Sequence, residues 1–427
     1  MIRSGDLNPV DLVEFCLSRI QQFDSQIRAW VLVDEEGARL EAHRLGELAR
    51  NGTIIGSLHG VPIGIKDIID VQGMPTVAGS PLRQNHIAAD DATVVKRLRK
   101  QGAIILGKTV TTEFACFDPS PTRNPWNLNH TPGGSSSGSA AAVASQLCMA
   151  ALGSQTGGSI IRPASYCGVA GIKPKFGSVP SDGVVPVSAS LDHVGPIARH
   201  VDDLSVVLSA IQDKSPAEPK DDAAIQPPEA QFAIFDRYFF EQADPAVQRI
   251  TQKAIDRLKS AGVEIETIKL PNSFDKVHQM HWRIMAAHAA EYHREQFETR
   301  PEDFGPNVSR LIEEGLRTTT DELNAALNHQ QEFKNELAKI LTENTVAITP
   351  ATVTTAPATL ETTGDPRFNS PWSYSGHPAV SFPCGLDENG MPSSLQLVSA
   401  MDNFELLKAA SWCEQQVDFD ARPHLNE

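Results

Sequence analysis

The fold of this chain is decided by three segments: GVPIGIKD (residues 60–67), TPGGSSSGSAAA (residues 131–142) and TGGSIIRPA (residues 156–164). Each segment places an amine or a hydroxyl beside glycine, whose missing side chain lets backbone amides approach a ligand closely. Because reactive groups and glycines recur in all three, we expect the segments to meet in one active site. The sequence therefore predicts an enzyme.

Lys66 directly follows the apolar run VPIGI of residues 61–65. Such a run predicts a buried strand, which would place the amine at the strand's end with little water around it. Burial disfavours the ammonium form and lowers the pKa of a lysine, so a neutral amine can act as a base near pH 7. A lone lysine is more often a surface residue, so this interpretation depends on the other two segments.

Ser159 follows the sequence Thr-Gly-Gly, which predicts several backbone N–H groups converging on one oxygen, as an oxyanion hole requires. Ser135 lies in a glycine-rich loop before an alanine-rich run that predicts a helix over residues 139–152. A glycine-rich loop at a helix start can also hold phosphate. This loop has no lysine at the position that a P-loop requires, which disfavours that alternative.

In this order the segments resemble the amidase signature family, whose members act on carboxamides with a Ser-Ser-Lys triad. The chain also matches the family at CGVAGIKP (residues 167–174), LDHVGPIAR (191–199) and GHPAV (376–380). The matching sequence is almost unbroken over residues 60–204, the predicted catalytic core, and returns near 349–397. The resemblance implies an α/β fold, with a mixed twisted β-sheet sandwiched between α-helical layers. It implies no metal and no organic cofactor.

The resemblance implies that Ser159 is the nucleophile, that Ser135 is a bridging serine held by a cis peptide, and that Lys66 is the base. Four backbone amides are implied to form the oxyanion hole: Thr156, Gly157, Gly158 and Ser159. Two further hydroxyls, those of Ser137 and Ser154, are expected to fix the Ser135 loop, although ordinary loop serines would look the same.

Two departures from the family pattern concern the substrate. Gln155 stands where an acidic residue is common, and Arg162 follows the nucleophile by three positions instead of two, as in the malonamidase branch. Without an acid at position 155, Arg162 is expected to bind a substrate carboxylate through paired hydrogen bonds. The alternative is an arginine tied to backbone carbonyls or a local acid. We therefore expect hydrolysis of a small-molecule amide, such as the dicarboxylic acid monoamide malonamate, to a carboxylate and ammonia.

A conventional serine hydrolase is an alternative, because residues 134–138 (GSSSG) satisfy the G-x-S-x-G pattern with Ser136 at its centre. A nucleophile elbow needs a strand directly before it. Residues 123–132 (RNPWNLNHTP) are polar and contain proline, so they predict a loop instead. His193 and His377 could only nominally complete such a triad.

A metal site is a further alternative, because five metal-binding side chains lie close together: His278, His281, His288, Glu291 and His293. Their spacing matches neither HExxH nor HxxEH. Helical spacing places His281 and His288 along one stripe, so the prediction is a core helix or a helix of the substrate pocket, and no metal.

The second functional hypothesis is an amidase-like subunit of a glutamine-dependent amidotransferase. Both hypotheses use the same triad, and they differ in whether the purified chain hydrolyses amides alone. The shorter chain and the shifted arginine favour the free hydrolase. A catalytically dead relative is disfavoured, because all three triad positions are intact.

Composition places limits on partners and compartment. The net charge of −16 over 427 residues disfavours nucleic acid as a partner, and no apolar run is long enough to span a membrane. Six cysteines without a CxxC pair and no recognisable signal peptide predict a reduced, cytoplasmic protein.

We expect a single domain over residues 1–427, with an embedded, mostly helical substrate-binding subregion at 213–345. Base rates alone predict a homodimer.

Overall fold

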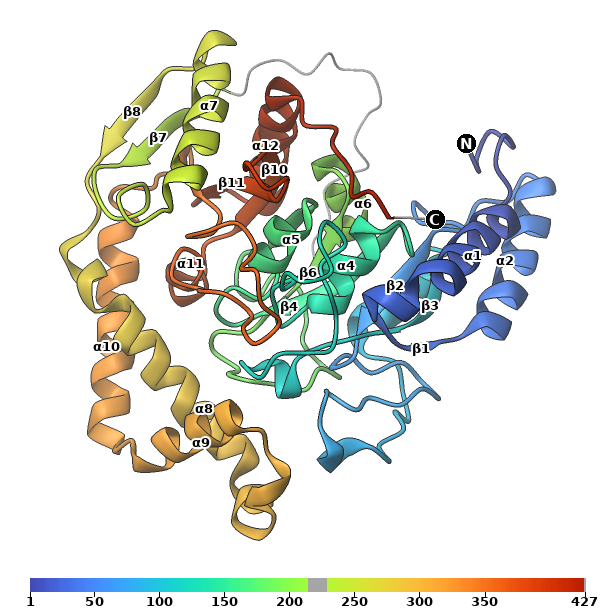
Figure 1. Cartoon of the computed structure of the whole chain (residues 1–427), viewed down its shortest axis with the longest axis horizontal. Helices are drawn as coiled ribbons and strands as arrows, with labels where there is room; N and C mark the ends of the chain where they lie inside the picture. The colour runs from blue at the N-terminus through green and yellow to red at the C-terminus, as the bar shows by residue number, and fades with distance from the viewer. Residues whose placement is uncertain (214–228, 426–427) are drawn as a thin grey trace.

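The computed structural model describes residues 1–213 and 229–425, in which one eleven-stranded sheet forms the centre (Figure 1). The strands lie in the order β1-β3-β2-β4-β6-β5-β10-β11-β9-β7-β8. Their bounds are β1 Trp30–Val33, β2 Pro62–Lys66, β3 Ile104–Thr109, β4 Ala150–Gln155, β5 Ala170–Lys173, β6 His193–Ala198, β7 Gln231–Phe235, β8 Ile265–Ile268, β9 Thr345–Pro350, β10 Ala379–Leu386 and β11 Pro392–Ser399. β2 is parallel to β3 and β4, and β7 is parallel to β8 and β9, whereas the other pairs are antiparallel. The sheet is therefore mixed, as predicted.

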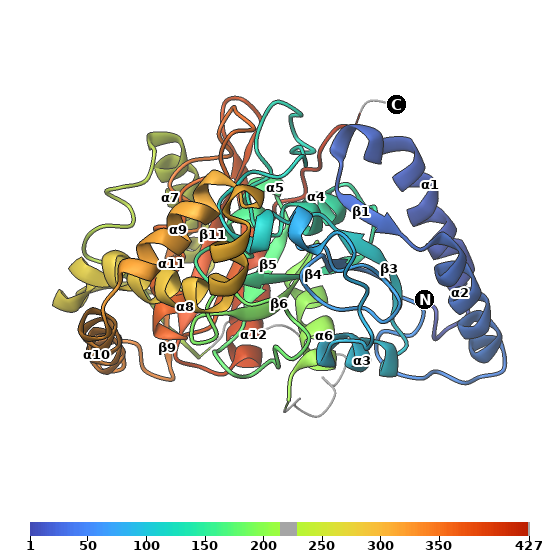
Figure 2. The same cartoon turned by 90° about the horizontal axis from the view of Figure 1, so that it is seen from below.

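Helices cover both faces of the sheet. Their bounds are α1 Pro9–Ile27, α2 Glu35–Arg50, α3 Thr93–Lys100, α4 Ser137–Ala144, α5 Ile161–Cys167, α6 Val201–Ile211, α7 Pro245–Ser260, α8 Val277–Thr299, α9 Pro306–Arg317, α10 Thr320–Leu337, α11 Ser370–Ser375 and α12 Asn403–Val417. In Figure 2, α4 and α5 lie on one side of the central strands, and α3, α6 and α12 lie on the other. The predicted α/β fold, with a sheet between helical layers, is confirmed.

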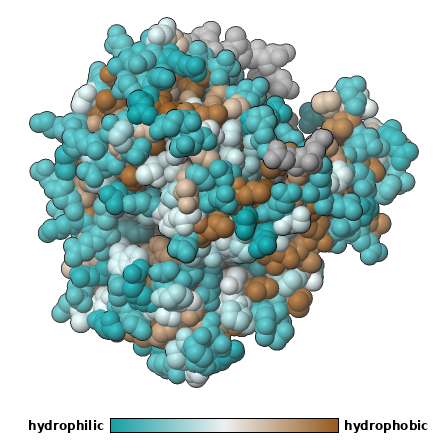
Figure 3. Space-filling view, viewed as in Figure 1, coloured by the Kyte–Doolittle hydropathy of each residue, from teal (hydrophilic) through white to brown (hydrophobic). Residues whose placement is uncertain are grey.

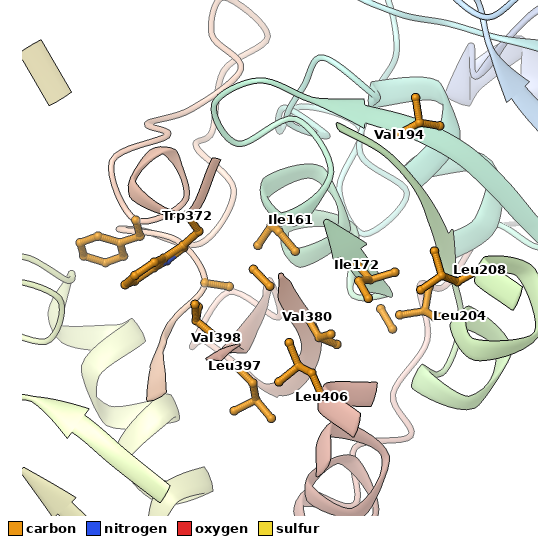
Figure 4. Packing of buried hydrophobic residues seen from close by; sticks show 14 of the residues in the cluster. Ile161, Ile172, Val194, Leu204, Leu208, Trp372, Val380, Leu397, Val398 and Leu406 are labelled. Carbon is orange, nitrogen blue, oxygen red and sulfur yellow. The ribbon is translucent and has the colours of Figure 1, made fainter. Parts of the chain in front are cut away.

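Buried apolar side chains hold these layers together (Figure 4). Ile172 of β5, Val380 of β10 and Leu397 of β11 belong to one buried cluster. Ile161 of α5 and Leu406 of α12 belong to the same cluster. Burying each side chain of this size contributes about 1.5–3 kcal/mol. The cluster therefore fixes α5, which follows Ser159, against the sheet.

One predicted element is wrong. The helix expected over residues 139–152 ends at Ala144, Gln146 takes a left-handed φ of 57°, and strand β4 begins at Ala150. β4 pairs with β2 and β6, so the backbone of residues 150–155 forms sheet hydrogen bonds in place of helical ones. Tertiary pairing here overrides the helical propensity of alanine.

The helical subregion also differs in part from the expectation. Residues 231–337 contain α7 to α10 but also β7 and β8, which form one edge of the sheet. In Figure 1 the helices α8, α9 and α10 lie together at the lower left, away from α1 and α2. Residues 214–228, the first part of the expected subregion, lie outside the described residues.

The surface is mostly polar on the face that Figure 3 shows, with smaller hydrophobic patches between the hydrophilic residues. Across residues 1–213 and 229–425, no helix is long and apolar enough to cross a membrane.

Candidate active site

Lys66 is the last residue of β2, and its side chain is fully buried. Its Nζ atom donates hydrogen bonds to the Ser135 hydroxyl (2.6 Å) and to the Ser154 hydroxyl (2.8 Å). Desolvation is the main cause that lowers the pKa of Lys66 to about 7, although the nearby Asp192 and Cys116 act in the opposite direction. Near pH 7, about half of this amine is therefore neutral and able to accept a proton.

The Ser135 loop is held by hydrogen bonds to its backbone. The Gly134–Ser135 peptide is cis. The Ser135 carbonyl accepts hydrogen bonds from the Ser137 hydroxyl and from the Thr112 N–H, both at 3.3 Å. The Ser137 hydroxyl in turn accepts one from Ser120 at 2.8 Å. The sequence-predicted Ser137 and Ser154 thus contact Ser135 and Lys66, respectively.

Residues 156–159, which we call the TGGS loop, connect β4 to α5. All four of its carbonyls accept hydrogen bonds, in order from His281 Nε2 (2.9 Å), Ser373 Oγ (3.2 Å), the Arg162 N–H (2.9 Å) and the Ser136 N–H (3.3 Å). None of its four N–H groups donates a hydrogen bond within the described residues. An unpaired buried N–H is costly unless a ligand satisfies it. The loop therefore offers four donors to a ligand oxygen.

The two glycines of the TGGS loop have different surroundings. A Cβ atom on Gly158 would lie 2.7 Å from Asn369 Oδ1, which is closer than real Cβ contacts allow. A Cβ on Gly157 would meet nothing nearer than Pro366 Cβ at 3.7 Å, an ordinary contact. A side chain at position 158 would therefore force Asn369 to move, whereas one at position 157 would not.

Ser159 lies at the wall of a cavity of about 540 Å³. Its side chain is partly exposed, unlike that of the buried Ser135. In the described part of the chain, its hydroxyl has no hydrogen-bond partner. Helix α8 contributes Trp282 and Met285 to the wall, and α9 contributes Arg310. The nucleophile predicted from the sequence therefore faces a space that can hold a substrate.

Arg162 lines the same cavity and is 3% exposed. Its Nη2 atom donates to the Gly134 carbonyl (2.8 Å) and to Thr363 Oγ1 (3.2 Å), whereas Nε and Nη1 have no partner among the described residues. Burial lowers the pKa of the guanidinium, which stays charged because its ordinary pKa is very high. Gln155, in the place of the usual acid, accepts hydrogen bonds from the Ile160 and Ile161 N–H groups. Arg162 is thus tied to one backbone carbonyl, as the alternative expected, but keeps two further donors.

The contacts of two residues in this site were not predicted from the sequence. Asp192 accepts a hydrogen bond from the Thr156 hydroxyl at 2.5 Å, and its other oxygen accepts from the backbone of Val187 and Ser188. His281 binds the Thr156 carbonyl. Asp192 belongs to the quoted LDHVGPIAR motif, so its position in a matched segment was the available signal.

The alternative nucleophile Ser136 is fully buried, and its hydroxyl donates to the Ser154 carbonyl at 3.3 Å. The loop before it contains no strand, as expected from residues 123–132. The structure therefore gives Ser136 a structural hydrogen bond and no access to the cavity lined by Ser159.

The fold and the site define an amide-cleaving class of enzyme. The chain belongs to the amidase family, because the family model named Amidase matches residues 11–405. It is 33% identical to the A subunit of glutamyl-tRNA(Gln) amidotransferase from Cyanothece sp., over 99% of this chain and 98% of the relative. It is also 33% identical to the protein of the same name from Carboxydothermus hydrogenoformans, over 99% and 97% of the two chains.

Solved structures give the same class. A protein complex that bears on the evolutionary origins of an s-triazine catabolic enzyme has a TM-score of 0.90, with 29% identity over 99% of this chain and 98% of that one. The peptide amidase of Stenotrophomonas maltophilia has a TM-score of 0.84, with 27% identity over 100% and 97%. The chain is thus an amidase-family hydrolase. The malonamidase branch is not singled out, and relatives named as subunits do not support the predicted homodimer.

Proposed function

We propose that this chain hydrolyses the carboxamide of a small substrate that also carries a carboxylate, through an acyl-Ser159 intermediate. The observation that carries the proposal is the buried Lys66 amine, 2.6 Å from Ser135 and with a pKa lowered to about 7, next to the TGGS loop, whose four N–H groups have no partner among the described residues. A base and a set of oxyanion donors are the two parts that acyl transfer requires.

The reaction has two half-reactions. The Ser159 oxygen attacks the amide carbon while its proton passes to Ser135, whose own proton passes to neutral Lys66. The four N–H groups of the TGGS loop hold the negative oxygen of the tetrahedral intermediate. The proton returns along the same route to the leaving nitrogen, the C–N bond breaks and ammonia departs. Water then attacks the acyl ester and gives its proton to the relay, the ester C–O bond breaks, the relay returns the proton to the Ser159 oxygen, and the carboxylate product departs.

The position of Arg162 favours a substrate that carries a carboxylate. This buried guanidinium keeps two donors, Nε and Nη1, and either of them can give a substrate carboxylate a charge-assisted hydrogen bond. Dicarboxylic acid monoamides such as malonamate carry that group a short distance from the amide. Glutamine also carries a carboxylate besides its amide, so the same arginine suits both candidate substrates.

The second candidate function is that of the amidase-like subunit of a glutamine-dependent amidotransferase. The specific observation in its favour is the similarity, over nearly the full length of both chains, to relatives named as the A subunit of glutamyl-tRNA(Gln) amidotransferase. Glutamine differs from malonamate in carrying an ammonium group, and the acid at the cavity wall, Asp365, is paired with Arg367 at 2.6 Å. This pairing engages the acid that lines the cavity, whereas the similarity to the named relatives favours the amidotransferase subunit over a malonamate hydrolase.

The test is ammonia release by the purified chain from malonamate, succinamate, L-glutamine and propionamide, run beside Ser159→Ala and Arg162→Gln. We expect release from the acidic amides, loss of all release in Ser159→Ala, and a raised KM for the acidic amides only in Arg162→Gln. Release from glutamine alone would favour the amidotransferase function. Undiminished release in Ser159→Ala would refute the mechanism.

A further inference from the structure

Helix α8 contacts the catalytic core through two histidines on one stripe. His281 donates from Nε2 to the Thr156 carbonyl at 2.9 Å. His288, seven residues and about two helical turns further on, places Nδ1 2.7 Å from the Ser188 hydroxyl. Both contacts join α8 to core segments far away in the sequence. This explains the histidine stripe without a metal.

Thr156 is held from a second side by Asp192. The Thr156 hydroxyl donates to Asp192 at 2.5 Å, and Asp192 is itself fixed by the backbone N–H groups of Val187 (2.9 Å) and Ser188 (3.0 Å). Ser188 is also the residue that contacts His288. The first residue of the TGGS loop therefore has its carbonyl and its hydroxyl bound by two different parts of the molecule.

We propose that His281 and Asp192 are positioning residues that fix Thr156 from both sides and thereby hold the N–H groups of the TGGS loop in the geometry that stabilises the oxyanion. The proposal rests on the function proposed above. His281 acts through an N–H donor only, because a carbonyl accepts and cannot donate. Burial lowers the pKa of His281 to about 4, which keeps the ring neutral at physiological pH.

The expected effect follows from geometry. Each oxyanion donor is worth about 100- to 1,000-fold in rate, and a displacement of about 1 Å in a positioned group costs about 100-fold. Loss of the His281 contact leaves the donors in place but less well fixed. We therefore expect a loss of about 10- to 100-fold in the acylation rate, with KM changed less than about threefold.

The experiment compares His281→Gln with His281→Met. Both replacements are flexible and of similar length, but only glutamine carries an N–H donor for the Thr156 carbonyl. The probe is diisopropyl fluorophosphate, whose phosphoryl oxygen takes the oxyanion's place, and the readout is the rate of the Ser159 adduct by mass spectrometry. His329→Ala is the control, because His329 is also a hydrogen-bonded histidine, with contacts to Tyr374 and Ser273, but lies outside the cavity.

We expect labelling to slow about 10- to 100-fold in His281→Met and to recover at least in part in His281→Gln, with His329→Ala near the wild-type rate. Equal rates in His281→Met and His329→Ala would overturn the proposal. If His281→Met does not fold, Thr156→Val tests the other contact, since it removes the hydroxyl that Asp192 binds and keeps the side-chain shape. A wild-type labelling rate in Thr156→Val would then refute the proposal that Thr156 is fixed from both sides. Labelling that persists in Ser159→Ala would instead refute the proposed function.

Discussion

The catalytic core and the helical subregion build their walls of the cavity from different kinds of residue. The core contributes the TGGS loop and Arg162 to the wall, and both are hydrogen-bonded to the Ser135 loop, which Lys66 contacts in turn. The helical subregion supplies large side chains, among them Trp282 and Met285, and the exposed Arg310. We therefore expect the core to cleave the bond and to bind the substrate carboxylate through Arg162, and the helices to supply further substrate contacts. Their separation is incomplete, because His281 of α8 contacts the core loop.

The largest expected effect is in the core, where Lys66→Met removes the base and keeps an apolar chain of similar length. We expect kcat for ammonia release to fall by about 10⁴- to 10⁶-fold, the range that loss of a member of a catalytic triad causes. Circular dichroism would show whether the fold is retained. A loss below about 100-fold would assign the proton transfer to another group.

The same variant tests the pKa of Lys66 through stability. The folded-state pKa of about 7 lies below the ordinary 10.5, so between these values the unfolded state binds more protons and the stability of the wild type rises with pH. Lys66→Met lacks this dependence. We expect the difference in the free energy of unfolding between Lys66→Met and the wild type, measured with urea, to fall by about 2 kcal/mol from pH 7 to pH 9. A constant difference would contradict the lowered pKa.

The two glycines of the TGGS loop provide a matched pair within the core. Gly158→Ala forces Cβ against Asn369 Oδ1, whereas Gly157→Ala makes only ordinary contacts. We expect kcat to fall about 100- to 1,000-fold in Gly158→Ala, as for loss of an oxyanion donor, and less than about tenfold in Gly157→Ala. Similar losses in both variants would mean that the loop's rigidity is not set by Asn369.

The sequence predicted those parts of the site that depend on neighbouring residues, and it missed those that depend on contacts between distant residues. Lys66 at a strand end and the glycines around Ser159 are features of a few neighbouring residues, and the structure places them together. The helix predicted over 139–152 was wrong because the partners of β4, which are β2 and β6, come from other parts of the chain. The contact of His281 was missed because its partner, Thr156, lies 125 residues away. Helical spacing places His281 and His288 on one face of α8 but does not identify the residues that this face contacts.

An intermediate effect is expected for Asp192→Asn, at the border of the two regions. The Asp192 carboxylate raises the pKa of Lys66 against desolvation, so its removal lowers the pKa of the amine further. The acid limb of the kcat/KM profile should therefore move to lower pH, while the amide oxygen still accepts from Thr156. The measurement is kcat/KM from pH 5 to 9. A fall in kcat without movement of the limb would assign Asp192 a positioning role alone.

The smallest effect is expected in the helical subregion. The Arg310 guanidinium lies 5.9 Å from the Trp282 ring centre and forms no ion pair within the described residues, so its charge is available to attract an anionic substrate. An exposed charge is screened by salt. Arg310→Gln should therefore raise KM for malonamate only about two- to fivefold at low salt, less at high salt, with kcat unchanged.

Arg317→Gln is the control for Arg310→Gln, because Arg317 lies on the same helix, pairs with Glu313 at 3.2 Å and does not line the cavity. We expect it to leave both KM and kcat unchanged. The informative comparison is between the change in KM and the change in kcat in Arg310→Gln. A raised KM alone would give α9 a role in attracting the substrate and none in bond cleavage. A parallel fall in kcat would show that α9 also orients the reacting amide. The helical subregion would then contribute to bond cleavage as well as to substrate binding.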